Sequence, residues 1–383
     1  MSQRLSDLPV GSLVKDTGSL FLNKPIIWKI ADKNHTGYPD GAITLITEKI
    51  IALRCFDAKE ASNSNSDRQS YGNNRYSLSN IRQWLNSDAE AGKWYAAQHS
   101  ADAAPNSSNV WQKDSVAVNP YDTNAGFLNG FSKQFKNALL ETTLTVGLNT
   151  VTDGGGSETV TDKIFLASNT EVGLANENSI VEGALLSIFS DDASRIASVT
   201  AEGLEDSNYA SDPAENAGWY WWLRTPLSSN TRSARLVASS GALNYSHAYY
   251  GYYGVRPLCN LSSLILVSDT TDSDGCYTLL FPREMNFDLS TPIEAETMPE
   301  RIAVELGAKI PFGATWSVKV CNNANDVEPT WEDCTAEVKA NLVHVFTNKT
   351  KTADNWAINI KVEVDASELE GDCYVSGIGG NWE

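Results

Sequence analysis

Apolar and polar residues alternate in three runs of the C-terminal part of the chain, at 302–306, 316–320 and 356–364. A period of two is typical of strands that bury one face. Turn residues separate the runs, and no helical period stands between them. Residues 278–383 are therefore predicted to form a small all-β domain, an immunoglobulin-like sandwich, with the Gly-rich C-terminus ending as a loop or held by a partner subunit.

A spacing of three to four residues predicts a helix over residues 127–140 with an apolar stripe facing the core. The stripe consists of Phe127, Leu128, Phe131, Phe135, Leu139 and Leu140. A shorter helix is predicted after Ser79 as N-cap, with Ile81, Trp84 and Leu85 on one face. Asp191 and Asp192 are typical of a helix N-terminus, where carboxylates complement the helix dipole.

Short strands are expected over residues 25–32, 42–53, 142–146, 163–166 and 255–268. Residues 62–75 are polar and are expected to form a loop, and residues 94–109 to form a surface excursion. The three glycines at 154–156 predict a loop, which lacks the GK[ST] ending of a phosphate-binding loop. Helices and strands together place residues 1–277 in the α+β class.

Composition and charge restrict the function. The 383 residues carry a formal net charge of −19, which disfavours nonspecific binding to nucleic acid because an acidic surface repels phosphates. The first residues hold no apolar run of a signal peptide, and no stretch has the length of a membrane span. The expectation is a protein made in a bacterial cytoplasm, without membrane insertion.

Candidate catalytic and metal-binding residues are sparse. Neither HExxH nor GxSxG occurs, and the spacing of His35 with Asp32 and Asp40 fits no metal site, so a turn histidine is favoured. The six cysteines form no CxxC pair and are expected to be buried thiols, with Cys321 and Cys334 most open to a bridge. No enzymatic activity, cofactor or metal is expected.

The stretch between Gly218 and Ser268, called the window below, contains no Asp or Glu although the chain has 48. It is rich in Tyr, Ser, Asn, Gly and Arg, as antibody paratopes are. At least two of Trp219, Trp221 and Trp222 are expected in the core, whereas the tyrosines are expected to be exposed. With four arginines, a surface window would be locally basic and aromatic.

Two motifs of the window, WYWWLRTP and YGVRPLCNL, resemble the C-type-lectin-like variable proteins of diversity-generating retroelements. PIIWKIADKNHTGYP, YGNNRYSLSNIRQWLNS, GFLNGFSKQF and DKIFLASNTEVGL extend the resemblance over residues 8–265. Many such proteins are receptor-binding tail proteins of gut phages and prophages. The resemblance implies a C-type-lectin-like (formylglycine-generating-enzyme-like) ligand-display domain at 1–277, with a variable stretch at 227–253.

It further implies a virion tail protein that attaches to a host-cell surface protein or glycan, contacts other tail proteins and forms a homo-oligomer, taken as a trimer. Trp222, Leu223, Arg224, Val255, Arg256 and Pro257 match the fixed frame. The positions that match the diversified contact residues are Asn230, Arg232, Ser233, Arg235, Asn244, Tyr245, Ser246, His247, Tyr249, Tyr250, Tyr252 and Tyr253.

The chain departs from simple members of that group because residues 254–383 follow its variable stretch. The EPN and WND loops of calcium-dependent sugar binding are absent, and Cys55 and Cys259 do not match the catalytic cysteines of formylglycine-generating enzymes. The lectin-like resemblance therefore does not imply a sugar ligand. Two alternatives stay open: a virion or bacterial structural protein with the window as subunit interface, and a glycan-cleaving enzyme, for which no acid pair is found.

Overall fold

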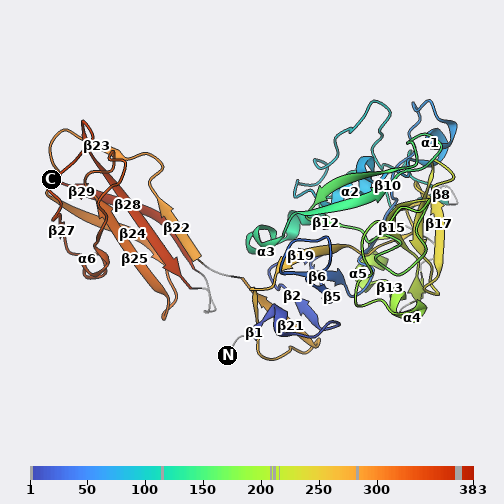
Figure 1. The fold of residues 1–383 in the computed structure, drawn as a ribbon, viewed down its shortest axis with the longest axis horizontal. Helices are drawn as coiled ribbons and strands as arrows, with labels where there is room; N and C mark the ends of the chain where they lie inside the picture. Colours follow the sequence, from blue (N-terminus) through green and yellow to red (C-terminus); the bar gives the residue numbers. More distant parts are fainter. Residues whose placement is uncertain are drawn as a thin grey trace. The chain divides into compact units, whose positions relative to one another are not determined.

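The computed structural model describes residues 3–113, 116–207, 209, 213–214, 216–281, 284–366 and 373–383. Its contacts divide the chain into an N-terminal unit, Met1–Leu279, and a C-terminal unit, Leu280–Glu383. Strands predominate over short helices (Figure 1), so the chain is of mixed α+β structure. No described helix is long and apolar enough to cross a membrane.

The larger sheet of the N-terminal unit has eight strands. Its centre is buried on both faces because β6, of sequence AITLIT, has every residue buried. In spatial order the strands are β1 (Gln3–Arg4), β20 (Leu266–Val267), β21 (Cys276–Leu280), β2 (Leu13–Lys15), β5 (Trp28–Lys33), β6 (Ala42–Thr47), β19 (Leu258–Ser262) and β12 (Ile164–Phe165).

A five-stranded sheet carries the window. Its order is β17 (Leu243–His247), β16 (Ser233–Val237), β15 (Trp221–Pro226), β18 (Gly254–Val255) and β7 (Ala52–Leu53). All of β15 is buried. Trp221 and Trp222 are completely buried, and their indole N–H groups donate to the carbonyls of Arg195 (3.1 Å) and Arg54 (2.8 Å). The expectation of at least two core tryptophans is confirmed, while Trp219 is half-buried.

Smaller strands and helices complete this unit. The strand pairs are β3 (Leu20–Phe21) with β4 (Lys24–Pro25), β8 (Gln112–Lys113) with β9 (Val116–Ala117), β10 (Thr142–Gly147) with β11 (Ser157–Asp162), and β13 (Ala197–Ser198) with β14 (Gly218–Trp219). The helices are α1 (Ser66–Tyr71), α2 (Asn80–Leu85), α3 (Lys133–Ala138), α4 (Asp192–Arg195) and α5 (Ala201–Glu205). Three 3₁₀ turns, η1 (Leu5–Asp7), η2 (Tyr76–Leu78) and η3 (Phe127–Gly130), precede some of them. The three glycines lie between β10 and β11, as the loop prediction requires.

The prediction of a single helix over residues 127–140 is wrong. The segment is split into η3 and α3, because Ser132 caps α3 by accepting a hydrogen bond from the N–H of Phe135 (3.0 Å). A Cβ at Gly130 would overlap the carbonyl oxygen of Leu20, so glycine is required at the break. The apolar stripe is buried as predicted, except that Leu140 is half-buried.

Three further expectations need correction. The polar segment 62–75 contains α1, which is capped by Asn65. Within the expected surface excursion, Trp94 is buried and stacks on Tyr121 with 5.3 Å between ring centroids. The apolar run 255–268 is divided among β18, β19 and β20. Both predicted caps are confirmed, at Ser79 for α2 and at Asp191 for α4.

The C-terminal unit contains two antiparallel sheets around one core (Figure 1). One has β22 (Glu284–Asp288), β28 (Trp356–Asp365), β25 (Thr315–Cys321) and β26 (Glu332–Asp333), with β23 (Ile293–Ala295) also paired to β28; the other has β27 (His344–Val345), β24 (Arg301–Lys309) and β29 (Tyr374–Trp382). The predicted alternation is confirmed, since Ile302, Val318 and Ile358 lie in the shared core.

Two details of this unit differ from expectation. A helix, α6 (Thr335–Ala340), interrupts the all-β pattern, and the Gly-rich C-terminus is the strand β29 rather than a loop. Neither has the apolar periodicity on which a local prediction depends. Cys321 and Cys334, expected to be the pair most open to a bridge, are buried free thiols.

Candidate functional site

The two loops of the window leave the same end of the five-stranded sheet. Residues 227–232 connect β15 to the antiparallel β16, and residues 248–253 follow β17. The N–H of Ala248 donates to the carbonyl of Arg232 at 2.8 Å, which joins the loops directly. The stretch expected to vary, 227–253, is therefore continuous in space and not only in sequence.

The first loop is held through its backbone carbonyls. The buried side-chain amide of Asn74 donates to the carbonyls of Leu227 (3.3 Å), Asn230 (2.9 Å) and Ser233 (3.0 Å). Asn149 fixes the orientation of that amide by donating to its oxygen at 3.1 Å. Every amino acid has a backbone carbonyl, so these bonds do not depend on the side chains of the loop.

The second loop is anchored in the same way. Backbone N–H groups from outside the window donate to it at 2.8–3.0 Å: Phe56 to Ala248, Trp111 to Tyr249, and Arg54 to Tyr253. The N–H of Tyr249 donates in turn to the carbonyl of Tyr71 at 3.0 Å. A Cβ at Gly251 would overlap the carbonyl of Val118, so glycine is required there. These backbone bonds hold the loop whichever side chains it carries.

Aromatic rings fill the space beside these loops and form what we call the ring cluster. His247 and Tyr250 stack at 5.4 Å and 7°, Tyr249 and Tyr250 at 4.9 Å, and Tyr252 and Tyr253 lie 4.4 Å apart. These contacts limit the side-chain torsions that each ring can adopt.

Three members of the ring cluster come from outside the window and were not predicted. Tyr71 lies 4.3 Å from His247, Trp111 lies 5.2 Å from Tyr250, and Tyr209 stacks on Tyr252 at 4.7 Å. Tyr71 and Trp111 are isolated aromatic residues in polar segments, which is the only local signal they offer. Because both residues are far from the window in the sequence, the sequence alone does not show that they contact it.

The predicted contact residues differ in exposure. Tyr245 is exposed, at 52%, whereas Tyr249, Tyr250, Tyr252 and Tyr253 are half-buried. The expectation of exposed tyrosines is confirmed for Tyr245 and holds only in part for the other four, because their rings cover one another. Asn230, Arg232, Arg235, Asn244 and His247 are also half-buried.

Three of the predicted contact residues take part in the fold itself. Ser233 and Ser246 are buried in β16 and β17. The side-chain oxygen of Asn230 accepts from the N–H groups of Arg232 (3.1 Å) and Ser233 (2.8 Å), and so shapes the turn itself. Polar residues that form turns and polar residues that contact ligands have the same appearance in a sequence.

The expected basic character of the window is wrong, because carboxylates from elsewhere in the chain neutralise it. Arg224 is buried in a bidentate pair with Glu171 (2.6 and 2.7 Å). Arg232 pairs with Asp67, and Arg235 pairs with Glu177. Arg256 is buried against backbone carbonyls, and burial lowers its pKa to about 10.

Two members of the ring cluster have shifted pKa values that favour their neutral forms. Burial, and then the positive charge of Arg232, lower the pKa of His247 below its ordinary value. Burial raises the pKa of Tyr249 to about 12. The guanidinium of Arg232 lies 5.1 Å from the centre of the Tyr71 ring, and that of Arg235 lies 5.6 Å from Tyr245. The surface therefore offers ring edges, hydroxyls and paired guanidinium groups.

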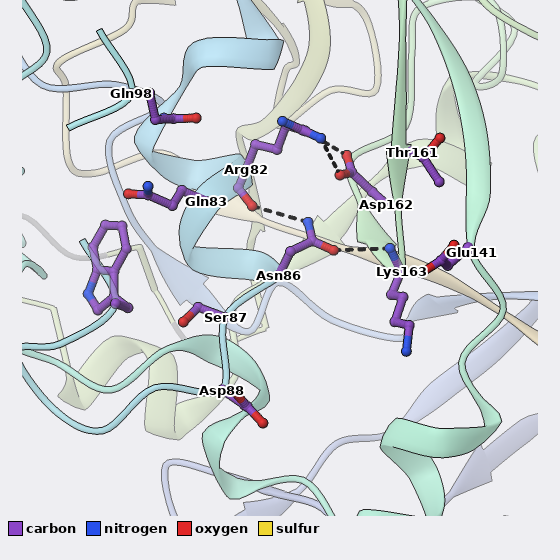
Figure 2. Close-up of a pocket in the computed structure, with 11 residues that line it drawn as sticks. Arg82, Gln83, Asn86, Ser87, Asp88, Gln98, Glu141, Thr161, Asp162 and Lys163 are labelled. Carbon is purple, nitrogen blue, oxygen red and sulfur yellow. Dashed lines mark hydrogen bonds and ion pairs between the residues drawn. The ribbon is translucent and has the colours of Figure 1, made fainter. Parts of the chain in front are cut away.

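Elsewhere, the described residues contain no group of three metal-ligating side chains. His35 is buried, and its Nδ1 lies 2.7 Å from Asp32, whose other oxygen accepts from the hydroxyl of Ser187 (2.6 Å). A hollow of about 520 Å³ lies beside α2 and β11 (Figure 2). There Arg82 pairs with Asp162 at 2.8 Å, and the hollow contains no residue of the window.

A family model described as a domain of unknown function, DUF6273, matches residues 41–263. The match covers more than half of the chain and includes β6, the five-stranded sheet and both loops of the window, so the chain belongs to this family. No curated protein and no solved structure matches.

Proposed function

We propose that this member of the DUF6273 family is a non-enzymatic binding protein that displays a replaceable, Tyr-, Asn- and Ser-rich surface for attachment to a host-cell surface ligand, as a receptor-binding protein of a phage tail. The proposal includes a C-type-lectin-like fold for the N-terminal unit and an immunoglobulin-like fold for the C-terminal unit. It also includes assembly with other tail proteins as a homo-oligomer in the virion.

The observation that carries the proposal is the anchorage of both loops through backbone atoms. Asn74, Phe56, Trp111 and Arg54 bond to carbonyl oxygens of the window and not to its side chains. A scaffold of this kind tolerates many side-chain sets on one backbone, which is what a diversified binding surface needs. The motifs that resemble retroelement variable proteins support the same conclusion.

The ring cluster suits recognition energetically. Tyrosine offers a large amphipathic contact area and loses only two torsions on binding. Mutual stacking has already restricted those torsions, so less entropy remains to be lost. A well-buried central tyrosine would contribute about 2 kcal/mol or more to binding. Several copies in one tail would multiply a modest affinity per site.

Adsorption to intact cells tests the proposal. The variant with Tyr249, Tyr250, Tyr252 and Tyr253 all changed to Ala is compared with Leu264→Ala, which removes an exposed side chain outside the variable stretch. The binding of each purified protein is measured on a panel of gut bacterial strains. The quadruple variant should lose binding by at least tenfold, and Leu264→Ala should bind as the original does. Equal binding by a folded quadruple variant would exclude the proposal.

The same variants separate the alternative in which the window is a subunit interface. If the ring cluster joins subunits, the quadruple change lowers the molar mass measured by light scattering. An unchanged molar mass together with lost adsorption favours ligand binding.

A further inference from the structure

No described strand pairs with the outer edge of β17. Among the residues that the structure describes, β17 is the last strand of its sheet and pairs with β16 alone. The pairing runs without a register shift from Ser233↔His247 to Val237↔Leu243. The β17 sequence, LNYSH, has no Lys, Arg, Asp, Glu or Pro. Natural sheets usually protect an edge with charge, proline or a bulge, and this edge has none of the three.

The ladder shows which backbone groups face outward. Ala248 N–H donates to Arg232 C=O, and Ala238 N–H donates to Ala242 C=O, both at 2.8 Å. Hydrogen-bonded pairs alternate along an antiparallel ladder, so the even-numbered residues of β17 bond to β16. The N–H and C=O groups of Leu243, Tyr245 and His247 therefore point away from the sheet.

Two of these outward groups have local partners. The side chain of Asn244 accepts from the N–H of Tyr245 at 2.8 Å, and the carbonyl of His247 accepts from Tyr250 at 3.2 Å. Within the described residues, nothing hydrogen-bonds the outward N–H groups of Leu243 and His247 or the outward carbonyls of Leu243 and Tyr245. The edge alternates donors and acceptors, which is the pattern that a second polypeptide backbone complements.

We propose that the ligand is a protein, and that an extended segment of it adds to the five-stranded sheet along β17. The inference rests on the proposed function and specifies the ligand class for the same surface. Backbone pairing at β17 would supply a contact common to all side-chain sets of the window. Tyr245, exposed on this strand, and the neighbouring ring cluster would then select the side chains of the added segment.

The position of Leu243 allows a sharp test, because proline there removes an outward N–H and no ladder bond. Leu243→Pro is compared with Leu243→Ala, which removes the side chain and keeps the N–H. The probe is the strain from the panel that binds best. Leu243→Pro should bind at least tenfold more weakly than Leu243→Ala. Equal binding by the two variants would overturn the inference.

A second measurement does not depend on the folding of the proline variant. Hydrogen exchange of the Leu243 and His247 amides is followed in the original protein, free and bound to cell envelopes. Strand addition should slow both amides at least tenfold, whereas unchanged exchange contradicts it. Digestion of the cells with proteinase K should abolish binding. Periodate oxidation of their glycans should leave binding unchanged.

The outcomes for the two proposals are distinguishable. In one outcome the tyrosine variant loses binding, Leu243→Pro and Leu243→Ala bind equally, and periodate abolishes binding. This outcome supports the display function and shows that the ligand is a glycan rather than a protein. Full binding by the tyrosine variant, or binding to none of the strains, contradicts the display function itself.

Discussion

At the scale of single residues, fixed and replaceable positions lie next to each other in the window. Gly251 is fixed by the carbonyl of Val118, although it stands among the tyrosines. Arg224 is fixed by its buried pair with Glu171. The rings on either side of Gly251 contact one another and the rings of Trp111 and Tyr209. Composition alone did not separate these two kinds of position, because the neighbour that fixes each one is distant in sequence.

The first prediction concerns Gly251. Gly251→Ala should lower the free energy of unfolding by about 2 kcal/mol or more, because its Cβ has no space and the obstacle is backbone. Gly156→Ala is the matched control, since a Cβ at Gly156 meets nothing within 4 Å. Urea unfolding of both variants measures the difference. Equal midpoints would show that the loop is not held against residue 118.

The second prediction concerns the buried pair. Glu171→Gln leaves Arg224 buried without its carboxylate partner and should cost about 3–5 kcal/mol of stability. Asp88→Asn breaks the more exposed pair with Lys136 and should cost under about 1 kcal/mol. A cost of the same size at both positions, measured by chemical unfolding, would argue against the structural role given to Arg224.

At the scale of elements, the sequence was sufficient where the cause was local. The caps at Ser79 and Asp191 and the alternation in β25 and β28 depend on neighbours within a few residues. The break between η3 and α3 depends in part on the carbonyl of Leu20, more than 100 residues away, so the apolar period alone could not predict it. For the same reason Tyr71 and Trp111 were missed.

The third prediction concerns the loop 227–233. Asn74→Ala removes three hydrogen bonds to its carbonyls, and should lower stability by about 2 kcal/mol or more while weakening adsorption. Ser229→Ala changes an exposed side chain of the same loop and should leave the unfolding midpoint unchanged. If Asn74→Ala left the unfolding midpoint and the adsorption unchanged, the amide would not be holding the loop.

The fourth prediction concerns a buried acidic cluster near the second loop. Asp57 accepts from the N–H groups of Asn73 and Asn80, both at 3.0 Å, and its own N–H bonds to Ala248. Burial, then Glu60 and Asp102, raise the pKa of Asp57 well above its ordinary value. The folded state therefore holds a proton that the unfolded state releases above about pH 4.

The sign of the pH effect follows from that proton. This contribution to stability falls as pH rises from about 4 towards the raised pKa of Asp57. Asp102→Asn removes one of the neighbouring charges and should reduce the fall. Urea midpoints of both proteins at pH 5, 6 and 7 measure it. A smaller fall in the original protein than in Asp102→Asn would contradict the assignment.

At the scale of the whole molecule, the chain contains two units with separate cores, and the window lies in one of them. The fifth prediction is that residues 1–279 alone retain adsorption to cells, with a dissociation constant per site within about threefold of the full chain. If cell binding required residues 280–383, the binding surface would lie outside the window or be shared by the two units.

The claim that one backbone supports many side-chain sets is tested most directly by a library. Positions 232, 235, 245, 247, 249, 250 and 252 are varied among Asn, Ser, Tyr, His, Asp, Thr and Ala, and thermal unfolding is measured for some fifty members. Most members should unfold cooperatively within a few degrees of the original protein while differing in the cells they bind. Loss of cooperative unfolding in most members would contradict a display scaffold.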